Sequence, residues 1–280
     1  FRGDMSKKRV LIISQEITPY TEENEISKIS RYLPQGIQEK GKEIRMFMPR
    51  YGVVNERRHQ LHEVIRLSGM NLIINDEDHP LIIKVASIPQ ARMQVYFIDN
   101  EDYFKRKAVH HDKETGEFFA DNDERAIFFG KGVIETVKKL GWAPDIIHCH
   151  GWMTAMVPMY IRTAYKNEPI FANSKIVFSL YNNPFDGTLN NEMAKKAIMD
   201  GVSGKDVENL AQPTFENLNK AAMTWSDAVI KGSEKLPEGL EKAFNDSDKM
   251  KLGYHNEDSY IDAYSDFYDE ILETNEVMAD

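Results

Sequence analysis

The sequence lacks several features that would assign a protein to a class at once. It contains a single cysteine, Cys149, which excludes an intramolecular disulfide and favours a reducing compartment. It has no G-x-G-x-x-G pattern and no P-loop, two common glycine-rich loops that bind phosphate groups. The apolar run from Val10 to Ile13 is too short for a signal sequence or a membrane span. These absences favour a cytoplasmic protein with no membrane anchor at this end.

Basic residues are few relative to acidic ones. The chain has 35 Lys and Arg against 45 Asp and Glu, a formal net charge of -10. This charge disfavours nucleic acid and anionic membranes as partners, because bulk electrostatics would repel both. Any anion would have to be recognised locally. Hydrophobic residues make up 41% of the 280 residues, which is enough for a large core.

Hydrophobic periodicity near the beginning predicts a βαβ unit. Val10–Ile13 is a continuous strand-like run, and apolar residues then recur at helical spacing from Ile26 to Ile37. Gly41 follows as a stop signal for that helix, and residues 43–48 indicate a second strand. Two strands joined by a helix imply parallel pairing and a right-handed crossover.

Residues 60–99 show a different pattern. Strand-like runs at 61–70, 71–74, 81–87 and 93–98 are separated by Gly, Asn-Asp and Pro-Gln. We predict a β-meander inserted after the βαβ unit.

The rest of the chain alternates between helical and strand-like segments. Such alternation predicts a doubly wound α/β fold with a parallel sheet. Residues 187–206 indicate a loop with one short helix. The expected helices are 122–140, 153–165 and 215–225, and the expected strands are 145–150, 175–180 and 227–231.

The last segment predicts an amphipathic helix with an aromatic stripe. From Tyr260 to Leu272, aromatic and aliphatic residues recur at helical spacing, and the other face is almost wholly acidic. No Lys or Arg follows Lys251. The helix must therefore dock through its aromatic stripe, on this domain or on a partner.

Several stretches, taken in order, resemble the bacterial glycogen/starch synthase family of retaining glucosyltransferases. The resemblance covers about Lys8 to Ser233 and implies the N-terminal domain of a GT-B fold, in which two Rossmann-like domains face a cleft. The stretches are "RVLIISQEITPY", "MFMPRYG", "VYFIDNEDYFKR", "FFADNDERAIFFGKGVIETVKKLGWAPDIIHCHGWMT" and "ENLNKAAMTWSDAVI".

The resemblance also implies how the chain is organised. Residues 1–7 are expected to be a tail, 8–233 a single Rossmann-like domain, and 234–280 a linker and a helix that returns to that domain. The fold class is then α/β, with a parallel sheet, an inserted β-meander and a C-terminal amphipathic helix packed back. On this interpretation the family's second domain is absent and its closing helix is kept.

The family's donor loop, E-x-x-P-x-x-K-T-G-G-L, is altered here. Glu16 and Pro19 remain, but the K-T-G-G positions are Glu22, Glu23, Asn24 and Glu25. One Lys-to-Glu reversal near a phosphate charge would weaken binding by roughly 5 kcal/mol. The alternative is that these acids favour the N-terminus of the following helix. Under either interpretation we expect that the loop does not hold ADP-glucose.

A second family motif, H-x-H-D-W-H, is also degenerate. It reads His148-Cys149-His150-Gly151-Trp152-Met153 in this chain. Alternation along a strand places the two histidines on one face and Cys149 on the other, which disfavours a Cys-His nucleophile pair. No cluster of Cys, His and Asp completes a metal site, so we expect neither a metal nor another cofactor.

The resemblance nominates Asp121 and His150 as catalytic residues. Asp121, followed by Asn122 and Arg125, resembles the aspartate that hydrogen-bonds the sugar, and His150 resembles the histidine of the reaction centre. A carboxylate near the sugar and a donor near the departing phosphate suit an oxocarbenium-like transition state. The alternatives are that Asp121 caps the helix from 122 and that His150 is a core histidine.

Four further residues match family positions that contact substrate. Tyr181-Asn182 stands at a V-H-N motif, and Lys220 stands at a lysine of F-L-K-A-G. Trp152 and Tyr181 could stack on a sugar face, whereas packing is the alternative for both. A solvated side chain is the alternative for Lys220.

Three classes of function follow from these residues. The family activity is glucosyl transfer from ADP-glucose to an α-1,4-glucan, and one wall of a cleft is expected to be inactive as an isolated chain. The alternative is a non-catalytic protein that binds α-glucan, regulates a complete synthase or self-associates through its exposed interdomain face. A different nucleotide-dependent enzyme is disfavoured because no glycine-rich phosphate loop is present.

Overall fold

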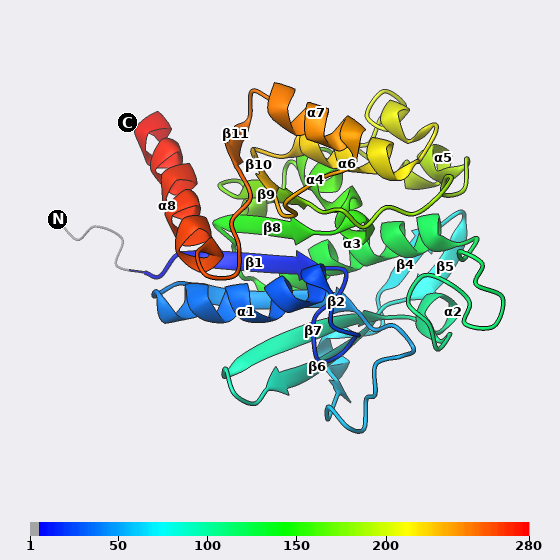
Figure 1. Ribbon diagram of the computed structural model, residues 1–280. Coiled ribbons are helices and arrows are strands. Elements are labelled where there is room, and N and C mark those ends of the chain that lie inside the picture. The colour runs from blue at the N-terminus through cyan, green and yellow to red at the C-terminus, as the bar shows by residue number, and fades with distance from the viewer. Residues whose placement is uncertain (1–5, 280) are drawn as a thin grey trace.

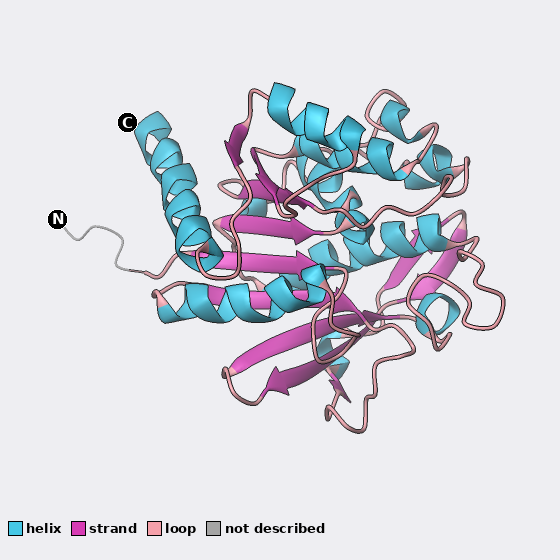
Figure 2. Ribbon diagram, viewed as in Figure 1, coloured by secondary structure: helices cyan, strands magenta, loops and turns pink. Residues whose placement is uncertain are grey.

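A mainly parallel β-sheet runs through the protein (Figure 2). The structure is a computed structural model that describes residues 6–279 and the side chains of residues 6–274. Within these residues the sheet has nine strands, in the order β11-β10-β9-β8-β1-β2-β7-β6-β3. The strands are β1 Arg9–Ser14, β2 Glu43–Pro49, β3 His62–Glu63, β6 Ile82–Ile88, β7 Met93–Asp99, β8 Ile146–His150, β9 Lys175–Leu180, β10 Ala228–Lys231 and β11 Met250–Leu252.

The strands from β11 to β7 are all parallel, and only the edge strands β6 and β3 run antiparallel to their neighbours. This confirms an α/β fold with a mainly parallel sheet, as predicted. Because β1 lies between β2 and β8, its apolar run is buried on both faces.

Helices cover both faces of the sheet (Figure 1). On one face α1 packs against β1, β2 and the C-terminal helix α8, and on the other face α3, α4 and α6 pack on one another in turn. The helices are α1 Glu25–Glu39, α2 Glu101–Phe104, α3 Asn122–Leu140, α4 Met156–Arg162, α5 Met193–Ala197, α6 Phe215–Trp225, α7 Glu238–Asp246 and α8 Tyr260–Ala279. No helix of residues 6–279 is long and apolar enough to cross a membrane.

Elements with strong periodicity and clear end signals lie where the sequence places them. Helices α3 and α6 and strand β9 have the predicted bounds. Gly141 ends α3 in the left-handed conformation, with φ of 62°. The loop 187–206 contains the single short helix α5, as expected.

The predicted strand at 61–70 is wrong. That segment forms the two-residue strand β3 and a 3-10 turn, Ile65–Leu67, because Arg66, Ser68 and Gly69 interrupt the alternation that a longer strand needs. The antiparallel strands of this region, β3, β6 and β7, continue the main sheet at one edge. The hairpin that stands apart is β4 (Asn71–Ile74) with β5 (Glu77–Pro80), and β5 was not predicted.

Two segments further along also differ from expectation. The helix predicted at 153–165 is a 3-10 turn, Trp152–Thr154, followed by the shorter helix α4. Residues 234–259, predicted to be a linker, contain α7 and the strand β11, which extends the sheet beside β10. Residues 1–5 of the predicted tail lie outside the described residues.

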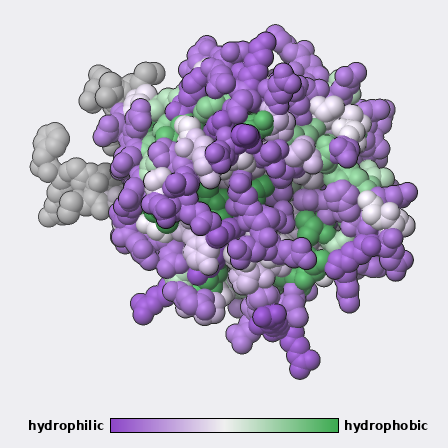
Figure 3. Space-filling view, viewed as in Figure 1, coloured by the Kyte–Doolittle hydropathy of each residue, from purple (hydrophilic) through white to green (hydrophobic). Residues whose placement is uncertain are grey.

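Helix α8 docks on this domain through its aromatic stripe. Tyr264 and Tyr268 are buried, and Ile261 packs so closely on Gly36 of α1 that a Cβ there would lie 2.5 Å from its methyl carbon. The acidic face carries ion pairs to α1 and the turn after it, namely Lys40–Asp262 and Lys42–Asp269, both at 2.7 Å. The prediction of an amphipathic helix packed back is confirmed. Most of the surface seen from this side is hydrophilic (Figure 3).

Candidate functional site

A cleft of about 650 Å³ lies at the carboxyl-terminal edge of the sheet. The loops that leave β1, β2 and β7 surround it, and the arrows of β1 and β8 point to this edge in Figure 1. Open parallel sheets bind ligands at this edge. The cleft is lined by Glu16, Pro19, Tyr20, Thr21, Glu22, Asn24, Val53, Asn55, Arg58, His59, Ala108, Val109, His110, His111 and Lys113.

The wall formed by the β1–α1 turn is acidic. Glu22 is exposed, and the half-buried Glu16 carboxylate accepts hydrogen bonds from Gln15 Nε2 at 3.2 Å and Asn24 Nδ2 at 3.0 Å. Burial raises the pKa of the Glu16 carboxyl, and these two hydrogen bonds oppose the rise. Glu16, Glu22 and Asn24 of the predicted loop are therefore brought together at one wall.

The N-terminus of α1 is closed by side chains of the chain itself. Asn24 Oδ1 accepts from the Ser27 N–H at 2.9 Å, and the Ser27 hydroxyl accepts from the Asn24 N–H at 2.8 Å. This reciprocal pair is a capping box, and Glu25 stands in the first turn, where acids are favoured. Glu25 therefore fits the alternative interpretation, an acidic helix N-terminus, whereas Glu22 and Glu23 precede the cap.

Glu23 and Glu25 face away from this cleft, toward a second hollow of about 480 Å³. There the Ser233 hydroxyl donates a hydrogen bond to the Glu25 carboxylate, which ties the start of α1 to the loop after β10. Asn24 lines both hollows. The predicted donor loop is therefore divided between two surfaces.

A second wall, formed by two other loops, is basic and was not predicted. Arg58 and His59 come from the loop after β2, and His111 and Lys113 from the loop before α3. His59 packs edge-on against Tyr20, with 5.0 Å between ring centroids. The signal that could have found this wall is that β2 and β7 are neighbouring parallel strands, because the loops after such strands emerge side by side.

The two histidines of the degenerate motif lie in the core, not in the cleft lining. His148 and His150 share one face, as predicted, with 3.9 Å between ring centroids, and both are fully buried. His148 is hydrogen-bonded through Nδ1 to the Tyr268 hydroxyl at 2.5 Å and through Nε2 to the Ser179 hydroxyl at 2.6 Å. Helix α8 therefore completes the partners of His148.

His150 is held by a residue that replaces a family histidine. Its Nδ1 atom is hydrogen-bonded to the Tyr181 hydroxyl at 2.7 Å, and its Nε2 atom has no partner among the described residues. Burial lowers the pKa of His150 to about 3, so the ring is neutral at physiological pH. Cys149, on the opposite face, is also buried, and burial raises the pKa of its thiol.

The missing acid of this motif has a steric explanation. Gly151 has φ of +95°, a conformation that disfavours side chains. A Cβ at Gly151 would lie 2.3 Å from Gln15 Oε1, and that oxygen accepts from the Met153 N–H at 3.3 Å. Gln15 thus occupies the space that an aspartate at 151 would need.

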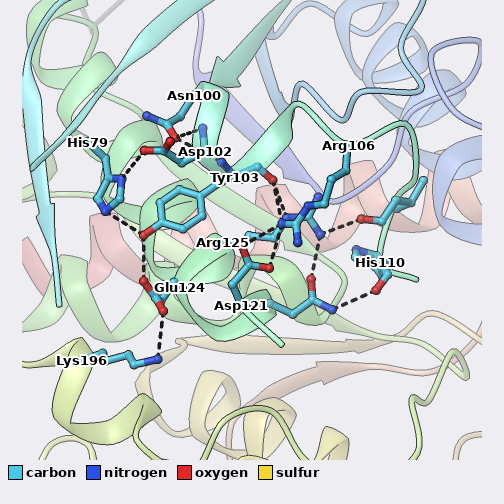
Figure 4. A network of polar contacts seen from close by, with 12 residues as sticks. His79, Asn100, Asp102, Tyr103, Arg106, His110, Asp121, Glu124, Arg125 and Lys196 are labelled. Carbon is cyan, nitrogen blue, oxygen red and sulfur yellow. Dashed lines mark hydrogen bonds and ion pairs between the residues drawn. The ribbon is translucent and has the colours of Figure 1, made fainter. Parts of the chain in front are cut away.

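Asp121, Asn122 and Arg125 belong to a polar network around the start of α3, in which Figure 4 shows Asp121 and Arg125 beside Tyr103 and Arg106. The fully buried Arg125 guanidinium donates to Asn122 Oδ1 at 2.7 Å and to the backbone carbonyls of Tyr103 in α2 and Val109 in the loop that follows. Asp121 is paired with Arg106 at 2.8 Å, and its side chain makes no helix-capping hydrogen bond, so the capping alternative is wrong. None of the three lines the cleft.

The other nominated residues are spread over the domain. Trp152 is 2% exposed and packs between His110 and Phe185, at 4.6 and 5.0 Å between ring centroids. Asn182 is exposed, with its backbone N–H donating to Ser233. Lys220 lies on α6 in an ion pair with Glu216 at 3.1 Å. Across residues 6–274, no group of three or more His, Cys, Asp and Glu could hold a metal ion.

Fold and cleft together define the class of protein. A doubly wound, mainly parallel sheet with a ligand-sized cleft at the carboxyl ends of its strands is a Rossmann-like α/β domain. Residues 9–248 match the family described as starch synthase catalytic domain. The chain belongs to this family.

Curated relatives agree with this assignment. The glycogen synthase of Chlorobium luteolum is 36% identical over 231 residues, covering 81% of this chain and 47% of that protein. The glycogen synthase of Chlorobaculum parvum is 36% identical over 244 residues, covering 84% and 50%. The chain therefore spans about half the length of the curated relatives it matches.

A solved structure shows the same fold. The catalytic domain of starch synthase IV from Arabidopsis thaliana, bound to ADP and acarbose, superposes with a TM-score of 0.74. The match covers 91% of this chain and 53% of that chain at 20% sequence identity.

Proposed function

We propose that this chain is a glucan-binding domain of the starch synthase family that does not, by itself, transfer glucose from ADP-glucose. The observation that carries the proposal is the closed N-terminus of α1. Asn24 and Ser27 occupy each other's backbone N–H groups, and Glu16 and Glu22 line the adjacent wall.

A sugar nucleotide needs what this turn no longer offers. Helix N-termini bind phosphate through free backbone N–H groups and the positive end of the helix dipole. Here the capping box uses two of these donors, the N–H groups of Asn24 and Ser27, and the Glu22 carboxylate lines the adjacent wall. A pyrophosphate at this turn would meet like charge with fewer compensating donors.

A neutral glucan carries no charge that the Glu22 carboxylate would repel. A carboxylate such as that of Glu16 accepts hydrogen bonds from sugar hydroxyls, and an amide such as that of Asn24 can both accept and donate them. The ring of Tyr20 adds an aromatic surface to the same wall, and the cleft volume is within the range of small-molecule sites.

A second candidate function is glucosyl transfer in a cleft whose missing side is supplied by a second protein molecule. Identity of 36% to two glycogen synthases favours it. The second wall would come from a complete synthase or from another copy of this chain, docked over the carboxyl-terminal edge of the sheet. The same docking contact would also suit a regulatory role, in which this chain binds a synthase but transfers no glucose itself.

Two assays separate the candidates. The first measures transfer of labelled glucose from ADP-glucose to glycogen, and the second measures retardation of the protein in glycogen-containing native gels. We expect no transfer and clear retardation, and Glu16→Ala should weaken retardation about tenfold while Glu114→Ala, a change at an exposed acid outside the cleft, leaves it intact. Transfer by the chain alone would contradict the proposal, and transfer only with an added synthase would establish the second candidate.

A further inference from the structure

The cleft lining carries acidic side chains on the β1–α1 turn and basic side chains on the loops after β2 and β7. One wall carries the carboxylates of Glu16 and Glu22, and the other carries the cations of Arg58 and Lys113. A ligand made only of sugar hydroxyls would use the first wall and leave the second without a role. The charge distribution therefore points to a ligand with an anionic group at one end.

The two cations have no acidic partner of their own. Within the described residues neither the Arg58 guanidinium nor the Lys113 ammonium takes part in an ion pair or a side-chain hydrogen bond. Some other surface lysines of this acidic protein are paired, as Lys28 is with Glu257 and Lys40 with Asp262. Two unpaired cations that face one cleft are available to a ligand.

Both cations stand on turns that hydrogen bonds hold in place. Asn55 Oδ1 accepts from the Arg58 N–H at 2.9 Å. Beside Lys113, the Asp112 carboxylate accepts from the N–H groups of Glu114 and Thr115, each at 2.9 Å, and these bonds lower the pKa of Asp112. A fixed backbone reduces the entropy that these side chains lose when they bind a ligand.

A buried hydroxyl in the cleft lining independently indicates a ligand. Thr21 is 6% exposed and lines the cleft, and its hydroxyl has no hydrogen-bond partner among the described residues. Buried polar groups in native proteins are nearly always paired. A sugar hydroxyl bound beside Glu16 would supply the missing partner.

We propose that the cleft binds a sugar phosphate, with the phosphoryl group between Arg58 and Lys113 and the sugar hydroxyls on Glu16 and Thr21. This rests on the proposed function, because both place a sugar against the β1–α1 turn. The phosphoryl group is then held by the loops after β2 and β7 and not by the β1–α1 turn that carries Glu22. Arginine is suited to this role because its planar guanidinium binds phosphate bidentately.

Titration calorimetry with the full chain tests the proposal. The probes are glucose 1-phosphate, glucose 6-phosphate, glucose and inorganic phosphate, so both parts of the ligand are also offered alone. We expect one of the two sugar phosphates to bind at least about tenfold more tightly than glucose or phosphate, because it engages both walls. Arg58→Ala and Lys113→Ala should each weaken that binding about tenfold and leave malto-oligosaccharide binding unchanged.

Matched controls lie in the same loops. Arg57 and Lys107 are exposed and do not line the cleft, so Arg57→Ala and Lys107→Ala should leave sugar phosphate binding intact. The inference is overturned if neither sugar phosphate binds better than glucose, or if the Arg58→Ala, Lys113→Ala double variant binds it normally. Retained malto-oligosaccharide binding in that case leaves the proposed function standing. Sugar phosphate binding without any glucan binding would contradict the proposed function and support the inference.

Discussion

Two groups of polar side chains lie near the carboxyl-terminal edge of the sheet, and they differ in how far the chain itself supplies their partners. In the first group, His148 and His150 are hydrogen-bonded to the buried residues Ser179, Tyr181 and Tyr268, although Nε2 of His150 has no partner among the described residues. In the second group, which lines the cleft, the Arg58 and Lys113 cations form no ion pair and the Thr21 hydroxyl no hydrogen bond within the part of the chain that the structure describes. The histidines that the family resemblance nominates are thus part of the core, while the cleft combines the altered donor loop with two loops that match no family motif.

Replacement of His148 should give the largest loss of unfolding free energy. His148→Ala leaves the Tyr268 and Ser179 hydroxyls without partners and opens a cavity under α8, which should cost about 3 kcal/mol of unfolding free energy. Urea denaturation followed by circular dichroism measures the loss. Lys113→Ala in the open group should change stability by less than about 0.5 kcal/mol. Equal losses of unfolding free energy for His148→Ala and Lys113→Ala would contradict the proposed difference between the two groups.

Acid should destabilise the closed group next most strongly. Burial lowers the pKa of His150 in the folded state to about 3, below its unfolded value, so the unfolded chain binds the extra proton first. The stabilisation is complete above about pH 6.5 and declines as the pH falls below that value. We expect about 2 kcal/mol less stability at pH 5 than at pH 7 from His150 alone. Unfolding free energies that stay constant between pH 7 and 5 would contradict a neutral, buried His150.

Restoration of the family donor-loop sequence should uncap the N-terminus of α1, so that its N–H groups become available to a ligand. The variant Glu22→Lys, Glu23→Thr, Asn24→Gly, Glu25→Gly removes the cap of α1, frees its N–H groups and reverses one charge in the cleft. We expect ADP-glucose affinity to rise at least about tenfold in equilibrium dialysis. The matched variant Glu22→Gln, Glu23→Gln, which removes charge but keeps the cap, should gain less. An equal gain would assign the effect to charge alone.

The cap itself predicts a smaller effect. Asn24→Ala removes the side chain that accepts the Ser27 N–H and should reduce the unfolding free energy by about 1 kcal/mol. Asn191→Ala, at an exposed loop position, should have no measurable effect. Thermal unfolding of both variants checks the difference. An unchanged midpoint for Asn24→Ala would show that the capping box does not hold the turn.

Much of the fold could be predicted because local patterns agree with the final packing. The helix 122–140 has strong periodicity and a glycine at its end, and the stripe of the last helix predicts its burial. The two-residue strand β3 and the strand β5 could not be predicted, because neither contains enough alternating residues to produce a signal. Strand β11, three residues long, is formed through pairing with β10, which sequence does not show.

The candidate site was predicted at one wall only. Motif positions led to Glu16, Glu22 and Asn24, which do line the cleft. Arg58 and Lys113 belong to no motif, and they line one cleft because β2 and β7 are neighbours in the sheet. Alternation along β8 showed that His148 and His150 share a face, but the Tyr268 hydroxyl that pairs with His148 comes from α8, more than a hundred positions away.

The central claim is that this cleft recognises sugar and rejects the pyrophosphate of a sugar nucleotide at the β1–α1 turn. Isothermal titration of the wild-type chain with maltoheptaose and with ADP-glucose, under identical salt and pH, tests it most directly. The account predicts a saturable isotherm for maltoheptaose and no binding of ADP-glucose that competes with it. Tighter binding of ADP-glucose than of maltoheptaose, lost on Asn24→Ala, would contradict the account.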